Sequence, residues 1–428
     1  MHTLAISEQE TSLHAEGDTL LLYRQASVLR RVRVAEIDQL LLFGRIELTS
    51  GAILLLLRRG VDVVWLTTHG EFRGRLVGRS SKNVPLRLAQ YRRTQQADFC
   101  ARVAAALVGG KIHQQRQLLL RAQRRLQDAD LAVALGQLRT LGQRARTCPS
   151  IDTLRGLEGQ AAAVYFGQLG KLLRNEELRF QGRTRRPPRD EVNAMLSFGY
   201  AVLGTTLETE MYRCGLDPLL GFFHQSAYGR PSLMLDLLEE FRPTIDALVV
   251  RLVNRRQVGP GDFARRTGKE LAELLNEEAS PPTAPTPAPQ PGVAAPWEDA
   301  LAATGAGQPP PAPVDPPAPP KALGGDVPVP PEAHVAGDPA AQGTAVPSNA
   351  QAPSPATDPP ATGVVGVYLA DVGRKIFLNE LFHRLRERLY YPPRNVTLEM
   401  REIIRQQIYH LARVIEGSDP QYQPFVTD

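Results

Sequence analysis

The stretch PLRLAQYRRTQQADFCARVAAALVGGKIHQQRQLLLRAQRRL, residues 85–126, decides the fold of this chain of 428 residues. Apolar side chains recur in it at helical spacing and almost nothing in it favours a β-strand, so it predicts long helices. Residues 85–150 carry twelve Lys and Arg but only three acids. A solvated helix face usually interleaves both signs of charge. The positive excess therefore favours contact with phosphates over a merely solvated surface.

The residues before this stretch follow a different pattern. Short runs such as TLLLYR, VRVAEIDQLLLF and RIELT predict strands separated by polar or glycine-containing breaks. Residues 51–60, GAILLLLRRG, predict a short helix that Ser50 caps and Gly60 ends. The runs VDVVWLT and EFRGRLVG predict further strands. Residues 1–84 therefore predict a small β-sheet domain. We expect it to act as a scaffold or dimer interface, because it contains no catalytic pattern.

The residues after the stretch divide into three parts. Residues 85–278 continue as an α-helical domain. Residues 279–363 hold 24 of the 36 prolines and few large apolar side chains, a composition that predicts a disordered insertion. Residues 364–428 return to amphipathic helices, which we expect to complete the α domain. The predicted class is α+β: a small N-terminal β-sheet domain, then a larger all-α catalytic domain with a disordered Pro/Ala-rich insertion.

Charge and cysteine content limit the partners and the compartment. The insertion carries a net charge of −6, so the rest of the chain carries +11. This favours a polyanionic partner, although charge alone does not separate DNA from RNA or an anionic surface. Three widely spaced cysteines without a CxxC pair are typical of reduced thiols. With neither a signal-peptide pattern nor an apolar run of about 18 residues, we expect a cytoplasmic protein away from membranes.

Residues 221–240, GFFHQSAYGRPSLMLDLLEE, contain most of the candidate site. His224 precedes a Gly-Arg-Pro-Ser turn. Asp236 and Glu239 fall on one face of the following helix at i and i+3, with Glu240 as the competing acid. Each residue alone has an ordinary explanation, either a hydrogen-bonded core histidine or a solvated helix acid. Their combination is what indicates a site.

A second segment, LRGLEGQAAAVYF, adds Glu158 between two glycines at a predicted helix start. A charge favoured by the helix dipole explains this residue as well as a ligand does. An imidazole together with carboxylates suits Mg²⁺ or Mn²⁺, and the imidazole shifts the preference toward Mn²⁺. Such a cation can neutralise a phosphoryl group and lower the pKa of an attacking hydroxyl. In a chain this basic, we predict a metal-dependent reaction on nucleic acid.

A basic, proline-containing loop, QGRTRRPPR, precedes the helix predicted from Asp190 onward. It could grip a substrate beside the site or be a disordered crossing, and the sequence favours neither reading. Spacing does not identify which arginines touch a backbone. The candidate DNA-contacting residues are Arg92, Arg93, Arg183, Arg185, Arg186, Arg189 and Arg230.

The ordered segments together resemble the CRISPR-associated endonuclease Cas1 family, the integrases of spacer acquisition. The family's N-terminal β-domain resembles FGRIELTSGAILLLLRRGVDVVWLTTHGEFRGRL, and its first basic helices resemble SKNVPLRLAQYRR and GGKIHQQRQLL. Its catalytic domain and C-terminal helices resemble LRGLEGQAAAVYF, VNAMLSFGYAVL, GLDPLLGFFHQSAYGRPSLMLDLLEEFRP and GVYLADVGRKIFL. The Pro/Ala-rich insertion departs from the family pattern but leaves the matched site residues intact.

This resemblance implies specific roles. The family's metal ligands correspond to Glu158, His224 and Glu239, with Asp236 as the adjacent acid of the same DxxE pattern, and these four are the catalytic candidates. It also implies Mg²⁺ or Mn²⁺ as cofactor, homodimers through the N-terminal region, and assembly with the small partner Cas2. The complex is expected to capture double-stranded DNA prespacers. Their 3′-hydroxyls then attack the repeat ends of a CRISPR array.

We therefore expect a metal-dependent DNA endonuclease and integrase that inserts short duplex DNA into a CRISPR array by transesterification. Two alternatives stay open. A metal-dependent nuclease on branched DNA repair intermediates would use similar chemistry without integration. A non-catalytic DNA-binding scaffold would carry a degenerate site, which the full set of ligand-type residues argues against.

Overall fold

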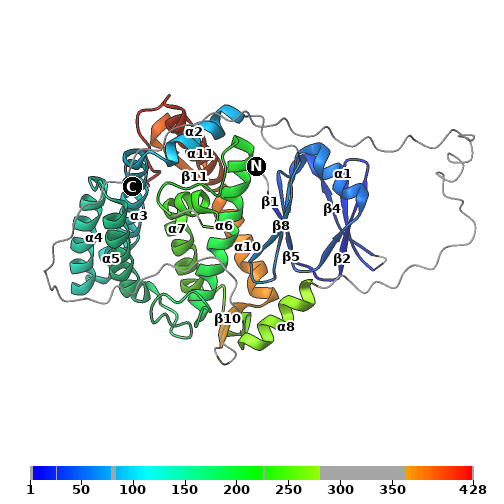
Figure 1. Ribbon diagram of the computed structural model, residues 1–428. Coiled ribbons are helices and arrows are strands. Elements are labelled where there is room, and N and C mark those ends of the chain that lie inside the picture. Colours follow the sequence, from blue (N-terminus) through cyan, green and yellow to red (C-terminus); the bar gives the residue numbers. More distant parts are fainter. Residues whose placement is uncertain are drawn as a thin grey trace, which may run out of the picture. The chain divides into compact units, whose positions relative to one another are not determined.

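The computed structural model describes residues 3–25, 27–78, 83–224, 227–279, 363 and 365–426 (Figure 1). The chain begins with a β domain of two four-stranded sheets, ordered β1-β5-β7-β8 and β4-β3-β2-β6. Helix α1 follows β6. The elements are β1 (Thr3–Ile6), β2 (Thr11–Glu16), β3 (Thr19–Arg24), β4 (Ser27–Arg33), β5 (Gln39–Phe43), β6 (Ile46–Leu48), α1 (Ser50–Arg59), β7 (Asp62–Leu66) and β8 (Phe72–Leu76).

Strand β5, QLLLF, explains how the β domain joins the rest of the protein. All five of its side chains are buried. Leu40 and Leu42 belong to the core between the two sheets, whereas Leu41 and Phe43 belong to the core shared with the helices. Successive side chains of a strand point to opposite faces, so β5 is buried on both. The β1-β5-β7-β8 sheet therefore lies between the other sheet and the helices.

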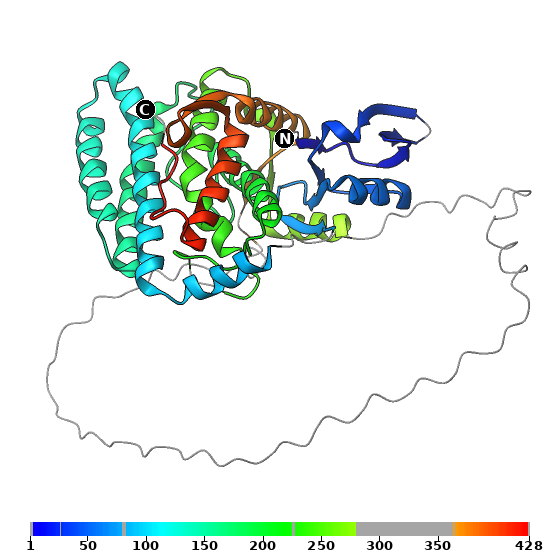
Figure 2. The same cartoon turned by 90° about the horizontal axis from the view of Figure 1, so that it is seen from above.

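The larger part of the chain is helical. In it α3 packs against α4, α5 and α7, and α6 packs against α7. Seen from above, α3, α4 and α5 run beside one another (Figure 2). Helix α3 is therefore the element to which both candidate-site helices, α5 and α7, attach. The helices are α2 (Val84–Thr94), α3 (Ala97–Leu126), α4 (Ala129–Arg146), α5 (Ile151–Leu169), α6 (Glu191–Cys214), α7 (Ser232–Asn254), α8 (Gly268–Ala279), α10 (Asp371–Arg386) and α11 (Met400–Glu416).

The residues on the two sides of the insertion meet in a strand pair. β9 (Phe263–Arg266) runs antiparallel to β10 (Gly366–Leu369). A hairpin of β11 (Arg388–Tyr391) and β12 (Val396–Glu399) then leads into α11, which packs against α2 and α6. Sequence reasoning predicted helices alone for residues 364–428 and missed these short strands. The predicted disorder of residues 279–363 lies outside the described residues, apart from Ala279 and Gly363.

The predicted fold class is confirmed, since a β-sheet domain precedes a helical one. One local prediction was wrong. Thr49 caps α1 in place of Ser50, because its hydroxyl accepts the Ala52 amide at 3.3 Å. The stretch at residues 85–126 is helical as predicted and forms two helices, with a break in the helical conformation between Thr94 and Ala97. None of the described helices is long and apolar enough to cross a membrane.

Asp246 on α7 is fully buried where α5, α6 and α7 meet. The hydroxyl of Tyr165 on α5 donates to its carboxylate at 2.8 Å, and that of Tyr200 on α6 donates to its other oxygen. Burial raises the pKa of Asp246 to about 6, although both hydrogen bonds favour the ionised form. One carboxylate thus ties together three helices.

The titration of Asp246 should appear in the pH dependence of stability. The folded protein holds this proton up to about pH 6, whereas the ordinary value is 3.8, so the folded state binds more protons between these limits. Stability from this group therefore falls as pH rises through the window, by on the order of 3 kcal/mol. Urea unfolding at several pH values should show this slope in the wild type relative to Asp246→Asn. Parallel profiles of the two proteins would contradict the assignment.

Candidate active site

Three helices bring two of the predicted site residues onto one buried ammonium group. Lys111 on α3 is 4% exposed. Its Nζ contacts Oε1 of Glu158 on α5 and lies 2.5 Å from Oε2 of Glu239 on α7. Because both carboxylate oxygens contact the same nitrogen atom, they are close neighbours. The two acids thus already converge on a single cationic position.

Glu239 is ionised by its surroundings. Burial alone would raise the pKa of its carboxyl, but the positive charges of Arg242 and Lys111 outweigh burial and hold the pKa well below its ordinary value. Arg242 donates from Nε to Oε1 at 3.0 Å. Oε2 is buried and contacts the ammonium of Lys111 at 2.5 Å. Glu239 therefore presents one oxygen fixed by Arg242 and another directed at the cationic position.

Asp236 accepts most of the hydrogen bonds that hold the loop with the candidate histidine. It is fully buried on α7. Its Oδ2 accepts the backbone amides of Phe222 (2.6 Å) and Phe223 (3.0 Å), and its Oδ1 accepts the amide of His224 (2.8 Å). Oδ1 also contacts the ring Nδ1 of His224 at 2.7 Å. Four donors thus converge on one carboxylate and wrap the loop around the start of α7.

The contact with Asp236 also sets the chemistry of His224. A carboxylate accepts hydrogen bonds, so Nδ1 carries the hydrogen and the lone pair of the neutral ring lies on Nε2. A histidine held in this way through its other nitrogen is the usual form of a metal-binding imidazole. The loop is further attached to α5, because Arg155 donates to the carbonyl of Phe223 at 3.1 Å. The His224 side chain is 20% exposed, so a ligand can reach it.

The structure separates the three acids of α7, which the sequence left as competing candidates. Asp236 accepts hydrogen bonds from the loop, and Glu239 contacts Lys111. The carboxylate of Glu240 points to the C-terminal part of the chain, where burial raises its pKa to about 7. Glu239 is therefore the acid placed to bind a cation, and Asp236 is placed to orient His224. The donors to Glu240 are Gln407, Tyr422 and Phe425, at 2.5–2.7 Å.

Two of the ordinary explanations offered by the sequence were wrong. Glu158 lies in the middle of α5 (Ile151–Leu169), so a helix-start charge does not account for it. Asp236, Glu239 and Glu240 are all buried instead of solvated. Sequence reasoning also missed Lys111 and Arg242 as site residues. The available signal was a basic residue within an otherwise buried helical run, which is costly unless acids pair with it.

Mg²⁺ and Mn²⁺ need hard oxygen ligands, to which Mn²⁺ can add an imidazole nitrogen. Among the described residues no group of three or more His, Cys, Asp and Glu side chains is close enough to hold a metal ion. What lies together is the carboxylate pair of Glu158 and Glu239 around one positive charge. These two hard carboxylate oxygens fit part of the ligand set that such an ion prefers.

Gly221 begins the loop and leaves no room for a side chain. A Cβ at this position would lie 2.7 Å from Oδ2 of Asp236 and 2.8 Å from the backbone carbon of Ser232. Gly221→Ala should therefore destabilise the protein by on the order of 1–3 kcal/mol in urea unfolding. Gly136→Ala on α4 is the matched control, because its Cβ would meet no atom of the described residues within 4 Å. The control should be neutral or stabilising, and equal losses would contradict the steric account.

The candidate DNA-contacting arginines fall into two groups. Arg183 is directed inward, donating to Asn193 (2.8 Å) and Ser197 (3.1 Å), and burial lowers its pKa to about 10. Arg93 donates to the carbonyl of Ile415 at 3.1 Å, at the end of α11. These two side chains serve the fold. Exposed or partly exposed positions are occupied by Arg92, Arg185, Arg186, Arg189 and Arg230.

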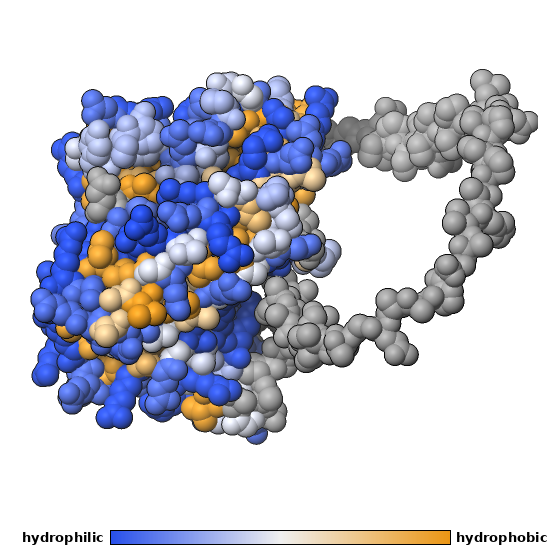
Figure 3. Space-filling view, turned by 90° about the vertical axis from the view of Figure 1, so that its left-hand side faces the viewer, coloured by the Kyte–Doolittle hydropathy of each residue, from blue (hydrophilic) through white to orange (hydrophobic). Residues whose placement is uncertain are grey.

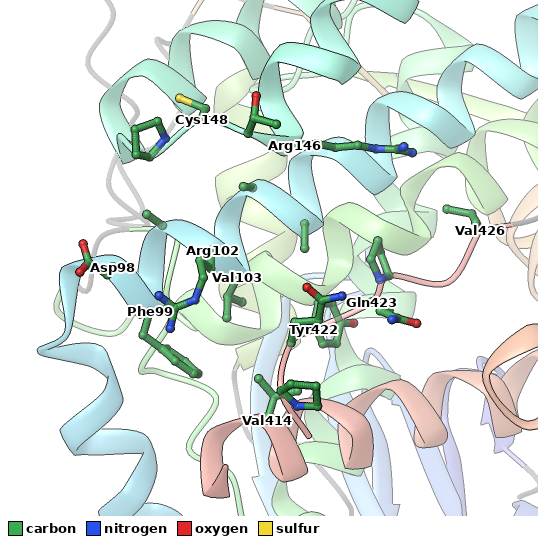
Figure 4. A pocket seen from close by; sticks show the side chains of 18 residues that line it. Asp98, Phe99, Arg102, Val103, Arg146, Cys148, Val414, Tyr422, Gln423 and Val426 are labelled. Atoms are coloured by element: carbon green, nitrogen blue, oxygen red, sulfur yellow. The ribbon is translucent and has the colours of Figure 1, made fainter. Parts of the chain in front are cut away.

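The surface away from the candidate active site is partly hydrophobic (Figure 3) and contains a further pocket. The side of the molecule that carries α4 and α5 is mainly hydrophilic, with hydrophobic side chains between (Figure 3). A separate pocket of about 800 Å³ lies between α3, the α4–α5 connection and the C-terminal segment. Arg102 and Arg146 are among its lining residues (Figure 4). None of the predicted site residues lines it, so it is distinct from the candidate active site.

Solved structures share this fold. A CAS1 protein from Thermotoga maritima superposes with a TM-score of 0.66 at 19% identity, with 100% of each chain covered. A casposase bound to integration product gives 0.66 at 18% identity, covering 99% of this chain and 93% of that chain. The Cas6-RT-Cas1–Cas2 complex gives 0.67 at 18% identity, covering 99% of this chain and 36% of that one. The fold is thus of the Cas1 class.

Sequence comparison identifies the family. The model of CRISPR associated protein Cas1 matches residues 4–281. The chain is 36% identical over 290 residues to the CRISPR-associated endonuclease Cas1 2 of Rhodospirillum rubrum, covering 65% of this chain and 83% of the relative. It is 36% identical over 273 residues to the Cas4/Cas1 fusion of Geobacter sulfurreducens, covering 62% of this chain and about half, 49%, of the fusion. The chain belongs to the Cas1 family of CRISPR-associated endonucleases.

Proposed function

We propose that the chain is a metal-dependent DNA endonuclease and integrase, which inserts short duplex DNA into a CRISPR array by transesterification. The observation that carries this proposal is the convergence of Glu158 and Glu239 on one cationic position, beside a histidine held by Asp236. Its setting is a chain of the Cas1 family, whose relatives are named endonucleases. A casposase of similar fold is bound to an integration product, which supports the strand-transfer step for this chain.

The cofactor in this proposal is Mg²⁺ or Mn²⁺, held by Glu158, Glu239 and Nε2 of His224. When bound, such a cation neutralises charge on the transferring phosphoryl group and lowers the pKa of the attacking hydroxyl. Asp236 keeps the proton on Nδ1 and fixes the ring. Arg242 keeps Glu239 ionised and in place.

The partners in this proposal are double-stranded DNA, a second copy of the chain and Cas2. The net charge of +11 outside the insertion suits duplex phosphates. The exposed arginines of the loop before α6 and of α2 are placed at the surface for such contacts. The likeness to the Cas1-containing part of a Cas6-RT-Cas1–Cas2 complex supports assembly with Cas2. Homodimers through the β domain belong to the same proposal.

Strand transfer tests the proposal directly. A fluorescent duplex prespacer is incubated with a supercoiled repeat plasmid, with Mn²⁺, Mg²⁺ or EDTA, and with or without Cas2. Covalent joining that needs the metal is the expected result. Nicking without joining when Cas2 is present would favour a nuclease on branched repair intermediates. DNA binding with neither nicking nor joining would favour a non-catalytic scaffold.

A further inference from the structure

We infer that Lys111 is a built-in counter-ion of the site, which competes with the divalent cation for Glu158 and Glu239 and holds the two carboxylates together in its absence. The inference rests on the proposed function, because it presupposes a divalent-cation site. It adds a role for a residue on α3, outside the predicted ligand set.

The contacts of Lys111 are those of a cation in a binding site. Its side chain is 5% exposed, and its ammonium contacts carboxylates from two different helices. A buried ammonium is costly unless anionic oxygens surround it, so the two acids stabilise it and it stabilises them. A divalent cation needs the same oxygens. A dication and an ammonium group also repel each other strongly at such short range, so the two occupants exclude each other.

Glu239 can lose its contact with Lys111 while it keeps its contact with Arg242. Its Oε1 accepts from Arg242 at 3.0 Å, and that guanidinium is stacked over the ring of Tyr200 at 4.5 Å. Its Oε2 faces Lys111, whose ammonium lies 2.5 Å away. A lysine stem has several rotatable bonds, whereas the stacked guanidinium is held more firmly. Lys111, and not Arg242, is therefore the partner that moves away from Glu239 when a divalent cation binds.

A second lysine in the same chain provides a matched control. Lys171 also joins two carboxylates, with Nζ at 2.8 Å from both Asp128 and Asp130. Its side chain is 32% exposed and it lies outside the candidate site. Removing either lysine leaves two carboxylates without their ammonium. If any such pair attracted a divalent cation, the two variants would respond alike.

The test follows the thermal unfolding of the full-length protein as MnCl₂ is titrated into a metal-free sample. The proteins are the wild type, Lys111→Met, Lys111→Arg and Lys171→Met. Lys111→Met should unfold at a lower temperature than the wild type in EDTA. Its Tm should respond at Mn²⁺ concentrations about tenfold lower than those needed by the wild type, because a competing charge is gone. Lys171→Met should respond at the wild-type concentration.

The possible outcomes separate the inference from the proposed function. If the Tm of the wild type and that of Lys111→Met rise at equal Mn²⁺ concentrations, Lys111 does not compete with the cation and the inference is wrong. The inference is also wrong if the variant needs more Mn²⁺ than the wild type, since Lys111 would then assist the metal. If neither protein responds, the cation site of the proposed function fails and takes the inference with it. If Lys111→Met does not fold, Lys111→Arg decides: it should need at least as much Mn²⁺ as the wild type, and a lower requirement overturns the inference.

Discussion

Replacing His224 or Glu158 with Ala should lower strand transfer at least about a hundredfold while leaving the affinity for duplex DNA nearly unchanged. Loss of a residue that merely orients a metal ligand typically costs about 10- to 100-fold, so loss of a ligand should cost no less. The exposed arginines that we propose as phosphate contacts lie outside this pair of residues. Joining in the plasmid assay and binding by fluorescence anisotropy at fixed salt measure the two quantities separately.

Matched substitutions control this prediction. Asp152→Ala changes an acid on α5, the helix that carries Glu158. The side chain of Asp152 is 89% exposed. His383→Ala changes an exposed histidine on α10. Both should retain wild-type joining. A folded His224→Ala protein that has lost DNA binding as well as joining would show that the residue serves the nucleic-acid interface and not the chemistry.

Asp236→Ala should destabilise the protein by about 3–5 kcal/mol, among the largest losses expected of a single substitution here. The change leaves three backbone amides, two of them in buried hydrogen bonds, and the ring of His224 without their acceptor. Each unsatisfied buried donor costs about 1–3 kcal/mol, reduced where water or a shifted loop compensates. Urea unfolding followed by circular dichroism measures the loss. Joining activity should fall with it, because His224 is no longer oriented.

Glu16→Ala on β2 is the control for this second prediction. Glu16 pairs with Arg31 at 3.5 Å, and both side chains are 67% exposed. An exposed pair contributes little, so this variant should lose less than about 1 kcal/mol. Similar losses in the two variants would show that the loop tolerates the absence of the Asp236 carboxylate and finds other acceptors.

The order of the domains could be predicted from the sequence because it depends on local patterns. The helical spacing of residues 85–126 and the strand-like runs before it both act over a few residues, and the structure follows them. The β9–β10 pair could not be predicted in this way. Its strands are four residues each and about a hundred residues apart, so neither carries a signal of its own. Pairing of this kind is decided by tertiary packing.

The candidate site shows the same limit. Glu158, His224, Asp236 and Glu239 were predicted by residue type and by family resemblance, but spacing did not separate the roles of the acids. Asp236 and Glu239 are three residues apart on one helix, yet one faces a loop and the other faces α3. Lys111 was not predicted as a site residue from the sequence, because its partners lie on other helices. Which side chains meet across α3, α5 and α7 depends on how the helices pack.

The β9–β10 pair has a consequence for the connectivity of the molecule. Strand β10 is positioned by its hydrogen bonds to β9, and α11 is positioned by its packing against α2 and α6. The residues after the insertion are therefore held by contacts with elements that precede it. The number of residues between the two strands then matters little, since each doubling of a connecting loop costs only about 0.6 kcal/mol. We therefore expect two fragments of the chain, one ending after β9 and the other beginning before β10, to assemble with each other. We also expect the connection between them to tolerate lengthening, shortening or the grafting of another domain.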